Sequence, residues 1–325
     1  MSLPISKTGL PAILQNVAVQ YRNPLYVADR VFPVIDNCPP EAKIARYLKG
    51  AWFRDEAGQR GPSGEAVRGG YPIDYINVVP QEYAFAKEVP DEDREVAGAM
   101  NGLPFSPDEA AISYATDKLL MKREIRTYSL IAASVWSGIA ASGTDAAGTW
   151  AAGAGNTFLA DIKAKKAVIQ GNTGLMPNCL LIDGGTYMSL TEESTILSKI
   201  QYTQRGVLTA DLLAAILDLE EVIVAYAVKS TAKENKAGSD FTAAKIWEYN
   251  ATKGMGFLFY RAPIVGLNNP SAGYIARSGA TPGGIKIQSW REESKHQDVY
   301  EASEKIDIVA AGLDLGYMWK DTLLT

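Results

Sequence analysis

The residues that could carry acid–base or metal chemistry are few and scattered. The one histidine, His296, lies within a strongly charged stretch at 291–298. General-base catalysis at neutral pH most often uses histidine, but such a setting is typical of an exposed strand or turn. Three consecutive acidic residues at 91–93 lack the spaced ligands and the glycine of a calcium loop, which favours a solvated acidic turn. The sequence therefore predicts no catalytic residue, no metal site and no cofactor.

Other candidate chemistry is equally weak. Cys38 and Cys179 lie far apart and form no CxxC pair, which favours two buried thiols in a reducing compartment. The adjacent carboxylates at 192–193, 220–221 and 292–293 fall on different faces of their elements, so no catalytic pair can be read from them. The glycine-rich stretch 54–70 contains neither of the common phosphate-binding glycine patterns. These observations favour a structural role over an enzymatic one.

The bulk properties are those of an ordinary globular protein. The 325 residues are 47% hydrophobic and 21% charged, with a formal net charge of -5. A negative balance argues against a protein whose main task is to grip phosphates, although local basic patches stay open. The first residues contain no apolar secretory segment, and no apolar run approaches the roughly 20 residues that span a bilayer. We expect a protein with no membrane partner that stays in the cytoplasm unless a larger particle carries it out.

Two segments lack the periodicity of a compact domain. Prolines at positions 24, 33, 39 and 40 exclude a long helix, and the aromatic and β-branched residues between them need a surface to pack on. We therefore expect an extended arm that lies on the chain's own surface or on a neighbour's. Residues 43–53 and 73–89 are predicted to form the strands of one long hairpin. Its tip, 54–70, is glycine-rich, charged and poor in apolar residues, so it cannot bury itself.

The clearest helix is predicted over 107–136. Ser106 as N-cap, Pro107 at the first helical position and Glu109 form a capping box. Roughly 30 residues give a helix about 45 Å long. Basic side chains crowd its middle, and such a stretch is usually a solvated helix face. They are Lys118, Lys122, Arg123 and Arg126.

Beyond this helix, residues 137–157 are rich in small side chains and mark a boundary. Helical and strand patterns then alternate, which predicts a compact α/β subdomain around one sheet, and the last segment returns to strands. The predicted helices are 158–169 and 209–217; the predicted strands are 179–182, 221–228, 245–249, 256–260, 285–287, 297–302 and 305–309, with a surface loop at 229–244.

Taken in order, these parts resemble the major capsid proteins of tailed double-stranded-DNA bacteriophages, which have the Hong Kong 97-like (HK97-like) fold. Residues 21–33 are similar to the family's N-terminal arm, with an aromatic residue, Asn-Pro, Ala-Asp and Phe-Pro in succession. Residues 49–55 look like the start of the family's long hairpin, the E-loop. Residues 174–182, with Met-Pro-Asn before an apolar strand, resemble the A-domain. The resemblance covers nearly the whole chain and rests on the order and spacing of these strings together.

The resemblance implies an α+β, HK97-like capsid fold with five parts. These are an N-terminal arm at 1–42, an E-loop at 43–90, a P-domain at 91–157 with its spine helix at 107–136, an A-domain at 158–280 and closing P-domain strands at 281–325.

The resemblance also implies a function and partners. Many copies, as hexamers and pentamers, would assemble in the host cytoplasm on a scaffolding protein, and the shell would fill with double-stranded DNA through a portal. The product is the icosahedral capsid of the virion, with room for a decoration protein. Because the chain reaches its arm within twenty residues, a separate scaffolding protein is expected. Some relatives cross-link an E-loop lysine to a P-domain asparagine, but the tip at 55–70 contains no lysine and Lys49 lies near the hairpin base, so we expect no such bond.

The same resemblance singles out two sets of residues. Expected contacts between subunits are Tyr21, Arg22, Pro24, Tyr26, Phe32, Trp52, Phe53, Arg54, Arg60 and Arg68. Lys118, Lys122, Arg123 and Arg126 are expected to face packaged DNA, by weak and non-specific contact. Two alternatives stay open: an encapsulin-like bacterial shell with protein cargo, against which the proline-rich arm argues, and a two-subdomain α/β enzyme.

Overall fold

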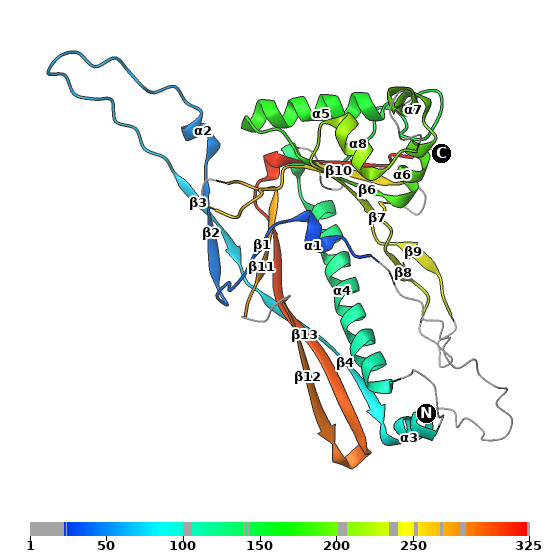
Figure 1. Ribbon diagram of the computed structural model, residues 1–325. Helices are drawn as coiled ribbons and strands as arrows, with labels where there is room; N and C mark the ends of the chain where they lie inside the picture. The colour runs from blue at the N-terminus through cyan, green and yellow to red at the C-terminus, as the bar shows by residue number, and fades with distance from the viewer. Residues whose placement is uncertain are drawn as a thin grey trace. The chain divides into compact units, whose positions relative to one another are not determined.

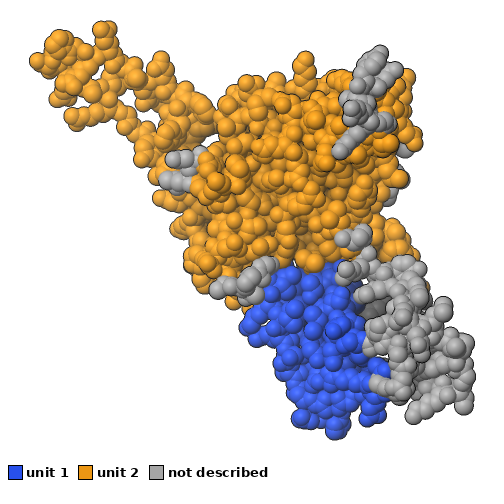
Figure 2. All heavy atoms as spheres, in the orientation of Figure 1, with its two compact units in different colours: residues 1–22, 83–119, 285–304 blue, residues 23–82, 120–284, 305–325 orange. Residues whose placement is uncertain are grey.

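The computed structural model describes residues 23, 25–99, 106–138, 141, 143–200, 207–233, 240–249, 253–266, 269–279 and 284–323. The chain divides into two compact units (Figure 2). The described part of unit 1 comes from 83–119 and 285–304, and that of unit 2 from 23–82, 120–284 and 305–325. Helices and strands are mixed in both units, so the α+β class is confirmed.

A mixed sheet of five strands forms the centre of unit 2. Its strand order is β5-β14-β10-β6-β7. β6 and β7 are parallel, and β10 runs antiparallel to both β6 and β14. Every residue of β6 and β10 is buried, so these strands read as continuous apolar runs rather than alternating ones. The bounds are Thr144–Asp145 (β5), Cys179–Asp183 (β6), Glu221–Ala225 (β7), Met255–Phe259 (β10) and Gly316–Lys320 (β14).

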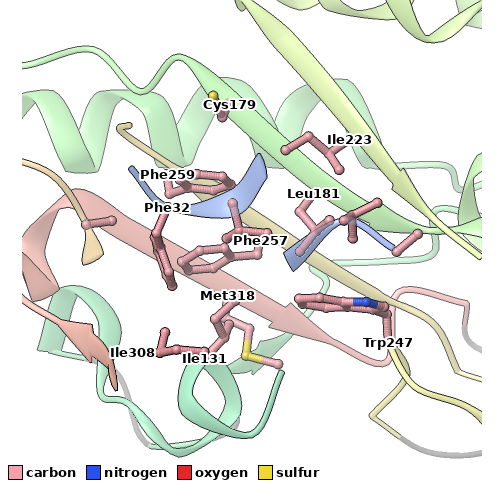
Figure 3. Close-up of a cluster of buried hydrophobic side chains, with 14 of the residues drawn as sticks. Phe32, Ile131, Cys179, Leu181, Ile223, Trp247, Phe257, Phe259, Ile308 and Met318 are labelled. Atoms are coloured by element: carbon pink, nitrogen blue, oxygen red, sulfur yellow. The ribbon is translucent and has the colours of Figure 1, made fainter. Parts of the chain in front are cut away.

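Each face of this sheet packs on its own apolar cluster. One cluster joins Leu180 and Leu258 to four helices on one side of the sheet (Figure 1). These helices are α5 (Phe158–Thr173), α6 (Gly184–Thr191), α7 (Ser194–Ile200) and α8 (Ala210–Leu217). The other cluster joins Leu181 and Phe257 to Ile131 and to the arm residues Val27 and Phe32 (Figure 3). The central strands are thereby covered on both sides.

Unit 2 also holds shorter elements. The arm forms a four-residue helix, α1 (Ala28–Val31), and strand β1 (Val34–Ile35), which pairs in parallel with β11 (Gly273–Arg277). A hairpin pairs β2 (Ala42–Tyr47) with β3 (Ile73–Val78), in register from Ala42 opposite Val78 to Tyr47 opposite Ile73. The remaining elements are α2 (Lys49–Trp52), β8 (Val228–Ser230), β9 (Ala243–Lys245) and the 3-10 turns η1 (Trp136–Gly138) and η3 (Leu313–Leu315).

Unit 1 is built on β4 (Gln81–Pro90), β12 (Ile285–Glu292) and β13 (Gln297–Ala310). β12 pairs antiparallel with residues 297–304 of β13, and β4 also pairs with β13. The small core of unit 1 contains Ala115, Leu119 and Ala302, with Tyr83 and Ile285 packed against it. Its helices are α3 (Asp91–Ala99), the turn η2 (Glu293–Lys295) and the first half of α4 (Pro107–Ala133).

Several element predictions are confirmed, and several are wrong in extent. Helix α4 begins at Pro107, and the Glu109 N–H donates to Ser106 Oγ at 3.4 Å, as the capping box predicts. It ends at Ala133 rather than 136, because the backbone breaks at Ser137 (φ 48°) into the separate turn η1. The acidic residues at 91–93 are not a turn but the first turn of α3, where carboxylates complement the helix dipole.

The β predictions need similar correction. The hairpin ladder is shorter than predicted, because β3 ends at Val78 and the chain then enters β4, a strand that pairs with β13. No strand covers 245–249, because β9 ends at Lys245. The predicted loop at 229–244 is instead closed by the pairing of β8 with β9 at its two ends. Strands 297–302 and 305–309 are one continuous strand, β13.

Candidate assembly surfaces

A buried carboxylate holds the arm on the chain's own core. Glu124 of α4 is fully buried, and its carboxylate accepts hydrogen bonds from the backbone N–H groups of Val27 (3.1 Å) and Ala28 (2.8 Å). The Trp247 indole N–H donates to the same carboxylate. Loss of hydration raises the pKa of Glu124 above its ordinary value, while these three donors oppose the rise. The carboxylate thus satisfies the unpaired N–H groups at the start of α1.

Two charge clusters add to this attachment. Asp29 lies between Arg123 Nη1 at 2.7 Å and Arg277 Nη2 at 3.0 Å. Glu221 pairs with Arg30, and its other oxygen lies 2.7 Å from Arg261 Nη2. The paired guanidinium groups lower the pKa of Glu221 in spite of the opposing effect of burial.

Phe32 completes the docking of the arm. Its ring is 1% exposed and meets Phe259 edge-on, with centroids 6.1 Å apart (Figure 3). Of the two arm environments left open above, residues 27–35 therefore occupy the chain's own surface. The expectation that Phe32 contacts another subunit is wrong, since no part of the ring is left for a neighbour.

The hairpin tip is exposed in contrast. Residues 53–72 contain no helix or strand (Figure 1), and every one of these residues is exposed. Trp52 and Phe53 are 61% and 68% exposed, although both are large apolar side chains. The rings of Tyr47, Trp52 and Tyr71 pack at centroid distances of 5.5–5.7 Å where the ladder ends. An exposed aromatic group of this kind marks an interaction surface.

The basic residues of the hairpin point outward as well. Arg54 pairs with Glu56 at 3.0 Å, and Arg60 Nε donates to the Gly64 carbonyl at 2.6 Å. Arg54, Arg60 and Arg68 are all exposed. At the hairpin base, Lys49 Nζ lies 2.7 Å from Asp314 Oδ2, so its ammonium group is engaged within the chain.

The structure separates the four basic residues predicted on the long helix. Arg123 is 2% exposed and pairs with Asp29, so the expectation that it faces DNA is wrong. Lys122 is exposed, and Arg126 is half-buried. In unit 1, half-buried Lys118 lies 5.0 Å from the centre of the Tyr114 ring.

Three of the predicted contact residues, Tyr21, Arg22 and Pro24, lie outside the described residues. Tyr26 is half-buried and packs against the main core, and its hydroxyl accepts from Asn23 Nδ2 at 3.3 Å. Asn23 in turn exchanges two hydrogen bonds with the backbone of Val228, at 2.8 and 3.0 Å.

Sequence reasoning missed the residues that hold the arm. Glu124, Trp247 and Arg277 carry no pattern that reveals their role, because the partners of Glu124 are backbone N–H groups and an indole far away in the chain. Glu124 also lies in a run of charged residues, where a carboxylate is usually solvated. Only the fold shows that this one is enclosed.

The residues considered for chemistry occupy ordinary structural positions. Cys38 and Cys179 are buried free thiols, and burial raises the pKa of Cys179 to about 12. His296 is exposed and ends the turn η2, as its charged setting predicts. Within the described ranges, no group of His, Cys, Asp and Glu side chains could hold a metal ion. None of the described helices has the apolar length that crossing a bilayer requires.

Unit 1 carries an ion-pair network of its own. Arg94 lies 2.7 Å from Asp108 and 2.5 Å from Asp298, and Arg291 lies 2.6 Å from Asp91. The Arg291 guanidinium is the main reason that the pKa of Asp91 is lowered. Beside this network, strand β12 forms the edge of its sheet with most side chains exposed.

Comparison with known proteins relates these features to phage capsid proteins. No family model matches the chain. The major capsid protein of Burkholderia phage BcepMu is 24% identical over 312 residues, which cover 94% of each chain. The capsid structure of cyanophage P-SCSP1u covers 96% of this chain and 93% of its own, with a TM-score of 0.61 and 13% identity.

A phage-related protein from Bordetella bronchiseptica RB50 has a TM-score of 0.63 and 19% identity, with coverage of 94% of this chain and 95% of its own. The structural likeness extends over both units, so the HK97-like fold is confirmed. The chain therefore has the HK97-like fold, and over 94% of its length it is similar in sequence to a phage major capsid protein.

Proposed function

We propose that many copies of this chain assemble, on a separate scaffolding protein, into the hexamers and pentamers of an icosahedral head that encloses double-stranded DNA. Sequence similarity to a phage major capsid protein supports the coat role, and a protein in this role self-associates and is a component of the virion. The scaffolding protein, the portal through which DNA enters, a decoration protein and assembly in the host cytoplasm are parts of the proposal.

One observation carries the proposal at the level of this chain. The hairpin residues 48–72 expose Trp52, Phe53 and Tyr71 together. A monomer gains nothing from three exposed aromatic rings, whereas a subunit that lies against a neighbour buries them on assembly. Arg54, Arg60 and Arg68 are exposed in the same segment of the hairpin and supply the polar groups that a protein interface also needs.

The parts of the chain are proposed to act separately. Residues 43–90 serve as the E-loop, 91–157 and 281–325 as the P-domain, and 158–280 as the A-domain, with 1–42 as the arm. Of the residues expected to face DNA, exposed Lys122 is the best placed, and one cation per subunit, repeated over the shell, gives weak contact without sequence preference.

Formation of particles by the purified full-length chain tests the proposal. The purified protein is examined by light scattering and negative-stain electron microscopy, alone and together with a candidate scaffolding protein. We expect closed particles of uniform diameter, and particles from infected cells should contain DNA. A species that stays near 35.0 kDa at every concentration, with and without scaffold, would contradict the proposal, and particles filled with protein cargo would replace it with an encapsulin-like function.

A further inference from the structure

Strand β12 of unit 1 has an unprotected edge. β12 pairs with β13 along one side, and among the described residues no strand pairs with its other side. Six of its eight residues are exposed, including Ile287 (51%) and Trp290 (43%). An exposed edge strand offers a row of backbone donors and acceptors to another chain, and soluble proteins normally shorten, bend or cover such an edge.

The side chains of β12 show which partner fits. In an antiparallel pair of two β12 strands centred on Ser289, residues equally distant from Ser289 lie opposite each other. Lys286 of each strand then lies opposite Glu292 of the other, so the pair contains two ion pairs of opposite charge. Among the described residues Lys286 has no ion-pair partner within its own chain. The other opposed pairs are Gln288 with Trp290, Ile287 with Arg291, and Ser289 with Ser289.

Neighbouring registers of the two β12 strands oppose the charged side chains less favourably. If the centre moves to the bond between Gln288 and Ser289, Lys286 lies opposite Arg291, and like charges directly opposite each other destabilise a ladder. Moving the centre by a full residue in either direction separates Lys286 from Glu292, and a centre on Trp290 also shortens the ladder within β12. Of the registers within β12, the one centred on Ser289 alone places Lys286 opposite Glu292.

We propose that β12 of one subunit pairs antiparallel with β12 of a second copy, around a two-fold axis that passes through Ser289. The contact is isologous, because the same surface serves both subunits, and an icosahedral shell provides two-fold axes between subunits. This inference rests on the proposed shell and specifies how two copies meet within it. Eight residues a side are too few for a stable dimer in solution, so the ladder forms where other shell contacts hold the subunits together.

Cysteine cross-linking in assembled particles tests the pairing. In Ser289→Cys the two thiols lie directly opposite each other, where Cα atoms are close enough for a disulfide. Gln288→Cys is the matched control: it is equally exposed on the same strand, but its counterpart lies diagonally across the ladder at about 7–8 Å. Cys38 and Cys179 are buried and add no background. With a mild oxidant, we expect at least about five-fold more disulfide-linked dimer from S289C than from Q288C.

A charge exchange checks the register independently. Added to S289C, Lys286→Glu places two carboxylates opposite each other at both ends of the ladder and should lower the dimer yield. The double exchange K286E/E292K restores opposite charges and should recover the yield, provided circular dichroism shows that loss of the Glu292 contact with Lys295 leaves the fold intact.

The outcomes separate this inference from the function on which it rests. Intact particles in which S289C and Q288C give equal dimer would overturn the β12 pairing and leave the capsid role standing. Failure of the double exchange to recover a yield that K286E lowers would overturn the register. Absence of particles from the unmodified chain would count against the proposed function instead.

Discussion

Arm residues 27–35 and hairpin residues 53–72 both lack the sequence periodicity of a compact domain, yet they lie in opposite environments. The arm segment buries Val27, Val31 and Phe32 in the main core and ties its backbone to Glu124. The hairpin segment buries none of its side chains and leaves Phe53 in solvent. The difference shows that the absence of sequence periodicity does not reveal whether a segment is buried on its own chain. What separates the two is whether the chain itself supplies partners for both the apolar side chains and the backbone N–H groups.

Truncation of one phenylalanine in each segment tests the contrast between the buried arm and the exposed hairpin with the largest expected effect. Phe32→Ala removes a fully buried ring and should lower the free energy of unfolding by about 3–5 kcal/mol. Phe53→Ala should change it by less than about 0.5 kcal/mol, because the ring is exposed in the free subunit, but should reduce the yield of particles. Urea denaturation of unassembled protein measures the first quantity and sedimentation measures the second. Equal losses of stability would contradict the contrast between the segments.

Glu124→Ala tests whether the buried carboxylate holds the arm. The change leaves the N–H groups of Val27, Ala28 and Trp247 without their acceptor, which should cost about 1–3 kcal/mol of unfolding free energy. Hydrogen exchange should then show faster exchange at residues 27 and 28 than in the unmodified protein. Glu221→Ala is the control, since that carboxylate binds the arm only through side chains. If the amides of residues 27 and 28 are equally protected from hydrogen exchange in E124A, the Glu124 carboxylate does not hold the arm.

The same carboxylate predicts a pH dependence. Because burial raises the pKa of Glu124, the folded state binds its proton more tightly than the unfolded state does. Its contribution to stability is therefore complete below the ordinary value of 4.5 and is lost as pH rises toward the higher folded pKa. Other carboxylates have the opposite effect on stability. Their pKa values are lowered by ion pairing, so their contribution is lost as pH falls; they are Asp74, Asp91 and Glu221.

Subtracting the unfolding free energy of a Glu124→Gln variant from that of the unmodified protein isolates the contribution of Glu124 to the pH dependence. The difference in unfolding free energy, unmodified protein minus variant, should fall as pH rises above 4.5. Denaturant titrations at several pH values measure it. A difference that rises with pH over this range would show that the carboxylate is stabilised in its charged form instead.

The smallest effect is expected at the arm's outer charge cluster. Arg30 and Glu221 are partly exposed, so their interaction is screened by solvent. A double-mutant cycle with Arg30→Ala and Glu221→Ala should give a coupling of at most about 1 kcal/mol, which falls as salt is added. A larger coupling that does not change with salt would mean that this pair holds the arm as firmly as Glu124 does.

Local signals in the sequence predicted part of the fold well. Ser106, Pro107 and Glu109 mark the start of α4 through contacts within one turn, and the apolar run at 179–182 marks a strand buried on both faces. The order of arm, hairpin, long helix and α/β region also sufficed for the family resemblance. The helix end at Ala133 was missed because the break at Ser137 follows from tertiary packing, in which the tilted rings of Trp136 and Phe257 lie with their centroids 4.8 Å apart.

The surfaces were harder to predict than the fold. Phe32 and Phe53 are both aromatic residues in irregular segments, and only the tertiary partners of Phe32 separate them. Arg123 and Lys122 are adjacent basic residues on one helix, yet a carboxylate 94 positions away pairs with the first, which is buried. Sequence spacing carries no information about such distant partners.

A cryo-electron microscopy map of the assembled particle tests the central claim most directly. The account predicts a closed icosahedral shell in which residues 27–35 of each subunit lie on that subunit's own Glu124 and Phe259, while Trp52 and Phe53 are buried against a neighbour. A shell whose arm segments occupy the cores of neighbouring subunits, or whose hairpin tips remain in solvent, would contradict it.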